Sequence, residues 1–175
     1  AAAGAVRLMT IHSSKGLEFP VCILAGAGRK YNMQDLTGKM LLHPQLGLAT
    51  KCHQEEGYFD YPTLPLEVVK RESRLAAMSE NLRVLYVAMT RPKEKLILVD
   101  AMYHAETRLK KLAAAAACPA APEAVAEGKC FGDWVLLPLL CRPEAASLRN
   151  LAGLDTDGLY TGDTKPWQVY IHDSS

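Results

Sequence analysis

Apolar residues form short, nearly continuous runs near the start of the chain. Residues 6–11 (VRLMTI) and 20–26 (PVCILAG) are two such runs, and residues 95–100 (KLILVD) are a third. Runs of this length, rich in Val, Ile and Leu, are typical of strands buried on both faces of a sheet. The pattern therefore predicts three strands of a mostly parallel sheet that is flanked by helices.

A helical pattern occupies residues 67–90. Pro65 precedes its first turn, and Pro92 disfavours helix at the residue before it, so the helix is expected to end there. The order strand, loop, strand, helix, strand predicts an α/β fold. Apolar residues recur along this helix at intervals of three, four and seven, the spacing of one helical face: Val68, Leu75, Met78, Leu82, Leu85 and Met89.

The remaining segments have weaker patterns. Glycine and proline interrupt residues 31–65, which predicts a long excursion that includes a hairpin. Residues 113–127 are mostly Ala, Pro and Glu and predict a linker, because the prolines prevent a long helix. Residues 131–141 predict a short apolar helix, and the alternation in residues 167–171 predicts a strand.

Composition narrows the class of protein. About half of the 175 residues are apolar, enough for one core, and no run reaches the roughly 18 apolar residues of a membrane span. The first residues lack the features of a signal peptide, so we expect a cytosolic protein. The five cysteines contain no C-x-x-C pair, which favours ordinary thiols over a metal site or a disulfide framework.

The charge is unevenly distributed. Residues 1–111 hold 16 Lys and Arg against 11 Asp and Glu, whereas residues 112–175 hold 4 against 8. The resulting charges of +5 and −4 are compatible with phosphate contacts in the first part. They are far from the strongly basic surface of an autonomous DNA-binding domain.

Two blocks carry the candidate chemistry: residues 10–19 (TIHSSKGLEF) and residues 86–91 (YVAMTR). The first contains a turn that leaves Lys15 and Glu18 exposed near a strand end, where open α/β sheets bind ligands. The second ends on Arg91, whose planar fork suits phosphate. Each residue also has an ordinary interpretation: Arg91 as a helix-end cation, and Glu18 as a surface carboxylate paired with Lys15.

A phosphate-binding loop of the form G-x-x-x-x-G-K-[ST] does not accompany these blocks. At Gly38-Lys39, Met40 replaces the required hydroxyl residue and Met33 replaces the first glycine. We therefore expect that this chain by itself does not hydrolyse ATP.

Both blocks resemble motifs of the UvrD-like, superfamily 1 DNA helicases, in which two RecA-like lobes close on ATP. The resemblance implies that the chain holds the C-terminal, RecA-like lobe, of the P-loop NTPase type, and that ATP is bound with Mg²⁺ whose ligands lie outside this chain. It further implies that Arg91 is the catalytic arginine finger, and that Gly16 and Glu18 bind the nucleotide. The residues that it assigns to DNA are Thr10, His12, Lys15 and Arg83.

Within this family the chain looks most like the AddA type of helicase–nuclease, on the residues 17–21 (LEFPV), 61–65 (YPTLP) and 131–134 (FGDW). That type implies unwinding of broken duplex ends, and its partners are the N-terminal lobe of the same chain and a second protein of AddB type. Two alternatives remain open: a UvrD-type repair helicase without nuclease, and a non-catalytic interaction module. The expected division is a helicase lobe (1–111, with motifs V and VI), a linker (112–129) and an appendage (130–175).

Overall fold

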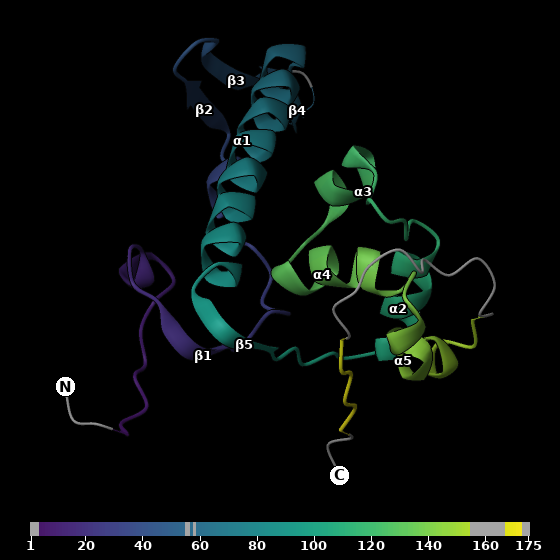
Figure 1. The fold of residues 1–175 in the computed structure, drawn as a ribbon. Coiled ribbons are helices and arrows are strands. Elements are labelled where there is room, and N and C mark those ends of the chain that lie inside the picture. Colours follow the sequence, from purple (N-terminus) through teal and green to yellow (C-terminus); the bar gives the residue numbers. More distant parts are fainter. Residues whose placement is uncertain (1–3, 55–56, 58, 155–166, 173–175) are drawn as a thin grey trace. The chain divides into compact units, whose positions relative to one another are not determined.

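The computed structural model describes residues 4–54, 57, 59–154 and 167–172 (Figure 1). The chain divides into two compact units, one built from residues 1–22 and 31–96 and the other from residues 23–30 and 97–175. The elements in chain order are η1 (His12–Ser14), β1 (Phe19–Leu24), η2 (Gln34–Leu36), β2 (Met40–His43), β3 (Gly47–Gln54), β4 (Phe59–Pro62), α1 (Leu64–Met89), β5 (Pro92–Leu98), α2 (Ala105–Ala113), α3 (Pro122–Glu127), α4 (Phe131–Leu139), η3 (Pro143–Ala145) and α5 (Ala146–Leu151).

Strands β1 and β5 form a two-stranded sheet, and the division into units passes through both of them. In the first unit the Phe19 amide donates to the Arg91 carbonyl at 3.1 Å, and in the second the Val99 amide donates to the Leu24 carbonyl at 2.9 Å. The residue numbers of the hydrogen-bonded partners increase in the same direction along both segments, so the strands are parallel. This pairing and the helices confirm the predicted α/β class.

The strand predicted at residues 6–11 is wrong. These residues have no regular structure, and the side chains of Val6 and Leu8 are 98% exposed. A strand needs a neighbour for its backbone N–H and C=O groups. None of the strands in the described residues lies beside this segment.

The predicted hairpin is present and has a third strand. In the first unit β2, β3 and β4 form an antiparallel sheet, with Leu41 opposite Ala49 and His53 opposite Asp60. Leu41 and Ala49 pack with Leu66 of α1 in a small core. Figure 1 shows this sheet beside the first turns of α1.

Helix α1 begins three residues before the predicted start. Thr63 is its N-cap, and its hydroxyl accepts from the Leu66 amide at 3.4 Å; Pro65 occupies the first turn, where a missing N–H costs nothing. The predicted apolar face is only partly buried. The buried residues are Leu66, Val69, Met78, Leu85 and Ala88, whereas Val68, Leu75, Leu82 and Met89 are each at least 37% exposed.

The second unit has the larger core. It is built by α2, α4 and α5, and its buried members are Leu109, Leu136, Leu139, Leu140, Ala145, Leu148 and Ala152. The predicted apolar helix at residues 131–141 is confirmed as α4. Helices α2 and α5, which span only nine and six residues, were not predicted from the sequence.

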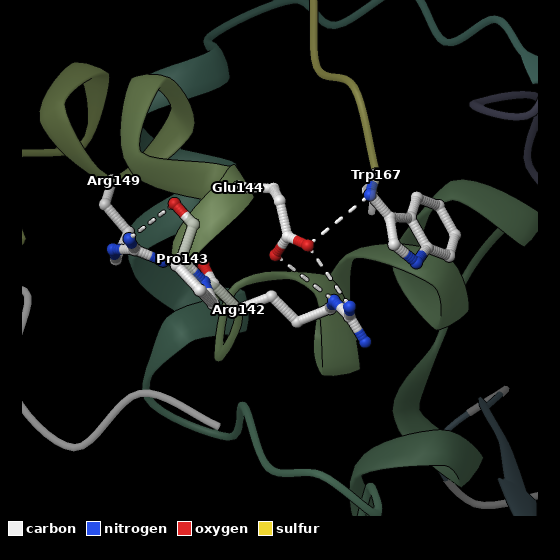
Figure 2. Close-up of polar contacts among 5 residues, drawn as sticks. All are labelled: Arg142, Pro143, Glu144, Arg149 and Trp167. Atoms are coloured by element: carbon white, nitrogen blue, oxygen red, sulfur yellow. Dashed lines mark hydrogen bonds and ion pairs between the residues drawn. The ribbon is translucent and has the colours of Figure 1, made fainter. Parts of the chain in front are cut away.

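Buried Arg149 stabilises the chain after α4. Its guanidinium donates to the carbonyls of Leu140, Arg142 and Pro143, and the residue as a whole is 4% exposed. Figure 2 shows the neighbouring contacts, in which Arg142 binds both carboxylate oxygens of Glu144. The same carboxylate accepts from the Trp167 amide at 3.4 Å.

The strand predicted at residues 167–171 is wrong. Trp167 and Val169 pack against the core of the second unit while Gln168 and Tyr170 are exposed, so the alternation is real. It comes from one-sided packing of an extended segment, without a strand partner in the described residues.

The segment predicted as a linker contains the short helix α3, and its boundaries at residues 112 and 129 remain predictions. In the described part of the chain, no helix combines the length and apolar character needed to cross a bilayer.

Candidate functional site

The candidate residues of both sequence blocks lie in the first unit, at the end of α1 and the start of β1 (Figure 1). The Phe19 amide pairs with the Arg91 carbonyl, which places the end of the first block beside the end of α1. Two segments more than 70 residues apart are therefore adjacent. The sequence predicts both blocks, but their adjacency is a finding of the structure.

The Arg91 guanidinium makes the second link between the blocks. Its Nη1 donates to the Leu17 carbonyl at 3.1 Å, and its Nε donates to the Val87 carbonyl at 3.1 Å. Its Nη2 donates to the Thr90 hydroxyl at 3.0 Å. These bonds use three of the five N–H donors of an arginine, so two donors remain for a phosphate.

A tight turn presents the first block. Residues His12–Ser14 form the 3-10 turn η1, and the Leu17 amide donates to the Ser14 carbonyl at 3.0 Å. Gly16 has a φ of +81° and no atom within 4 Å of the position that a Cβ would take. The turn needs glycine because that backbone conformation is strained for other residues.

Thr10 has a structural role in this turn. Its hydroxyl accepts from the Ser13 amide at 3.2 Å and lies 2.8 Å from the Ser13 hydroxyl. The side chains of Thr10, His12 and Lys15 are all exposed. The structure thus brings these three predicted DNA contacts together on one turn; their contact with DNA stays a prediction.

Glu18 is exposed and pairs with a lysine that sequence reasoning missed. Its carboxylate lies 3.2 Å from Lys93 Nζ, and the two side chains are 60% and 59% exposed. The predicted alternative was a pair with Lys15. Because β1 and β5 are parallel and adjacent, Lys93 near the start of β5 reaches Glu18 just before β1. Exposed pairs of this kind contribute little to stability, so Glu18 can exchange this partner for a ligand.

Arg83 lies apart from this cluster along α1, about two helical turns before the end. It pairs with Glu80 at 3.2 Å on the exposed side of the helix. The structure does not join it to Arg91 or to the turn. Its predicted DNA contact remains a prediction.

The site lies beside the ends of two strands. Glu18 and Arg91 immediately precede β1 and β5, so they lie at the amino ends of these strands. The strand end expected near Lys15 and Glu18 is therefore the start of β1, because residues 6–11 do not form a strand. Among the described residues, no three His, Cys, Asp or Glu side chains are grouped to hold a metal ion.

The fold and the two joined blocks define the class of protein. Residues 1–103 match the family of the UvrD-like helicase C-terminal domain. The chain belongs to this family, which confirms the resemblance of the two blocks.

Several relatives share a more specific name. The chain is 37% identical over 171 residues to the A subunit of the ATP-dependent helicase/nuclease of Clostridium kluyveri, covering 95% of this chain and 14% of that protein. It is 40% identical over 169 residues to the protein of that name from Moorella thermoacetica, covering 95% and 12%. With the protein of that name from Bacillus velezensis, identity is 56% over 106 residues, covering 61% and 9%. The chain thus spans at most about one seventh of the length of these relatives.

Proposed function

We propose that this chain is the part of an ATP-dependent DNA helicase, of the AddA helicase/nuclease type, that links the γ-phosphate of ATP to single-stranded DNA. The observation that carries the proposal is the bond from Arg91 to the Leu17 carbonyl. It joins the arginine to the loop that holds Glu18 and continues into the turn of Thr10, His12 and Lys15. A movement of Arg91 when the γ-phosphate is bound or lost can therefore be transmitted, through one hydrogen bond and a short stretch of backbone, to the residues proposed to contact DNA.

The residues present fit a nucleotide. Arg91 keeps two donors for phosphate oxygens, and Glu18 offers an exposed carboxylate for the ribose hydroxyls. Gly16 leaves the loop backbone open to close approach. ATP is the substrate, and Mg²⁺ and a phosphate-binding loop come from the N-terminal lobe of the same protein. Hydrolysis then drives translocation along one strand and unwinding of broken duplex ends, in partnership with a second protein of AddB type.

Arg91 supplies positive charge where negative charge develops during phosphoryl transfer. An arginine in this role contributes about 10³ to 10⁵ in rate in phosphoryl-transfer enzymes. Its hydrogen bonds to Leu17 and Val87 orient the guanidinium before the reaction, so little reorganisation accompanies catalysis. Thr10, His12 and Lys15 contact the DNA backbone, and Arg83 adds charge along α1.

The test is DNA-stimulated ATP hydrolysis by the full-length parent protein. We expect Arg91→Ala to lower turnover by about 10³-fold or more, with ATP and DNA binding retained. Arg91→Lys keeps a charge but not the fork, and should also be strongly impaired. Arg71→Ala, which removes an exposed arginine from α1, the helix that precedes Arg91, is the matched control and should leave turnover unchanged.

Turnover of Arg91→Ala within tenfold of the wild type would contradict the catalytic role. A parent protein without any ATPase activity would favour the interaction-module alternative. The names of the relatives support the helicase/nuclease type over a UvrD-type helicase without nuclease. Degradation of duplex ends by the parent, together with its AddB-type partner, distinguishes these two.

A further inference from the structure

Thr90 belongs to the second block, but the sequence alone assigns no role to it. Its hydroxyl donates to the Tyr86 carbonyl at 3.0 Å and lies 3.1 Å from the Val87 carbonyl. The same oxygen accepts from Arg91 Nη2 at 3.0 Å. Because the single hydroxyl proton points to the helix carbonyls, the oxygen lone pairs are available to the arginine.

The hydroxyl is not needed to end the helix. The Thr90 amide already donates to the Tyr86 carbonyl at 3.1 Å and to the Val87 carbonyl at 3.3 Å, and so closes the last turn of α1. Thr90 is also exposed, so its side chain fills no core. The hydroxyl's contacts to the Tyr86 and Val87 carbonyls duplicate bonds that the amide already makes, whereas its contact to Arg91 has no backbone substitute.

Three acceptors surround the Arg91 guanidinium, and they differ in kind. Leu17 and Val87 contribute backbone carbonyls, whereas Thr90 contributes a side chain. The three bonds reach Nη1, Nε and Nη2 respectively, and three contacts at three atoms determine the plane of the group. Loss of the Thr90 bond leaves Nη2 without that restraint.

We propose that Thr90 is a positioning residue, whose hydroxyl fixes the plane of the Arg91 guanidinium so that its two remaining donors meet the transferred phosphate. This inference rests on the proposed function of Arg91 and adds a residue that orients it. Thr90 itself touches neither nucleotide nor DNA. Misplacement of a catalytic group by about 1 Å can cost about 10²-fold in rate, which sets the effect to expect.

The experiment compares Thr90→Val and Thr90→Ser in the full-length parent protein. Valine keeps the branched shape and removes the hydroxyl, whereas serine keeps the hydroxyl. We expect Thr90→Val to lower kcat of DNA-stimulated ATP hydrolysis by roughly 10- to 100-fold, with the KM for ATP and the Kd for DNA within about threefold of wild type. Thr90→Ser should retain most of the activity.

A double variant tests whether Thr90 acts through Arg91. In an Arg91→Ala background, Thr90→Val should cause no further loss, because the group that it orients is gone. A further loss of tenfold or more in that background would overturn the inference. So would a raised KM together with a lowered melting temperature in Thr90→Val, which would indicate a structural role.

The outcomes for Thr90 and Arg91 are distinguishable. If Arg91→Ala is strongly impaired but Thr90→Val is within twofold of wild type, the positioning role fails and the proposed function stands. If Arg91→Ala is itself unimpaired, the proposed function fails and the positioning role fails with it.

Discussion

Individual residues determine the geometry of the turn before β1. Gly16, at a φ of +81°, lets the chain reverse after η1 and brings the Leu17 carbonyl to Arg91. Thr10 braces the same turn from its other side. The chemistry of the site thus depends on residues whose first role is local backbone geometry.

Gly16→Ala should strain this turn. An L-residue with a side chain in the left-handed region costs about 1–2 kcal/mol. We expect faster amide hydrogen exchange in residues 13–18 of the parent protein, by about fivefold or more. Gly16→Asn is the matched control, since asparagine tolerates positive φ better than alanine and should show a smaller increase. Equal exchange in Gly16→Ala and wild type would mean that the turn is not held at this φ.

The stability of the three-stranded sheet should depend on pH through Asp60. Hydrogen bonds from Lys39 at 2.6 Å and from His53 at 2.9 Å lower the pKa of this carboxyl group to about 2. A carboxyl group whose pKa is lower in the folded state stabilises the protein above its unfolded pKa, and this stabilisation is lost as the pH falls through the folded pKa.

Asp60→Asn should therefore destabilise the chain at pH 7 but not near pH 2. Chemical denaturation of wild type and variant should show a difference in the free energy of unfolding that shrinks between about pH 4 and pH 2. Asp35→Asn, which alters an exposed carboxylate in η2, is the control. A difference that does not change over this interval would exclude the lowered pKa as its cause.

In helix α1 the sequence predicts the ends of the helix better than it predicts which side chains are buried. Its ends follow from Thr63, Pro65 and Pro92, which act through the backbone. Its buried face does not follow from the apolar spacing, because β2 and β3 cover only the side that carries Leu66 and Val69. Val68 and Leu75, which have the spacing of a buried face, are 43% and 42% exposed.

Thr63 connects the start of α1 to the sheet. Besides accepting from the Leu66 amide, its hydroxyl donates to the Thr50 carbonyl of β3 at 2.6 Å. Thr63→Val removes both bonds and should lower the free energy of unfolding by about 1–2 kcal/mol. Thr63→Ser keeps the hydroxyl and should lose much less. Urea denaturation measures both, and an equal loss in the two variants would argue against the hydroxyl as the cause.

For the molecule as a whole, side-chain clusters join elements that no local pattern connects. In the second unit, Arg108 of α2 binds Asp133 of α4 at 2.9 Å and lies 3.1 Å from Asp100, which follows β5. A Cβ at Gly132 would lie 2.2 Å from Asp100 Oδ2, so a larger residue there would displace this carboxylate. The cluster holds α2 and α4 to the end of β5.

Arg108→Met should be strongly destabilising, because it leaves two mostly buried carboxylates without their cation. Breaking a buried pair in this way typically costs about 3–5 kcal/mol. Lys110→Met, two residues further along α2, removes an exposed pair with Glu106 and should lower the free energy of unfolding far less. Urea denaturation of the two variants measures this contrast. A similar loss in both would mean that the Asp100 and Asp133 carboxylates are solvated.

Sequence alone determined the features that depend on neighbouring residues. The helices predicted at residues 67–90 and 131–141 and the hairpin follow from prolines, glycines and apolar spacing, and the structure has the two helices at residues 64–89 and 131–139. The two blocks around Glu18 and Arg91 were recognisable because their residue types are specific to the family, which the match over residues 1–103 confirms.

Only the tertiary structure decided which segments meet. Residues 6–11 and 167–171 have strand-like patterns but no strand neighbour among the described residues, and a sequence pattern does not specify a partner. The bond from Arg91 to Leu17, the pair of Glu18 with Lys93 and the bond from Arg91 to Thr90 were likewise invisible in the sequence. Each depends on parallel pairing of β1 and β5 or on a side-chain conformation at the helix end. Strand pairing and side-chain conformation depend on contacts between residues that are far apart in the chain. A local sequence pattern does not contain that information.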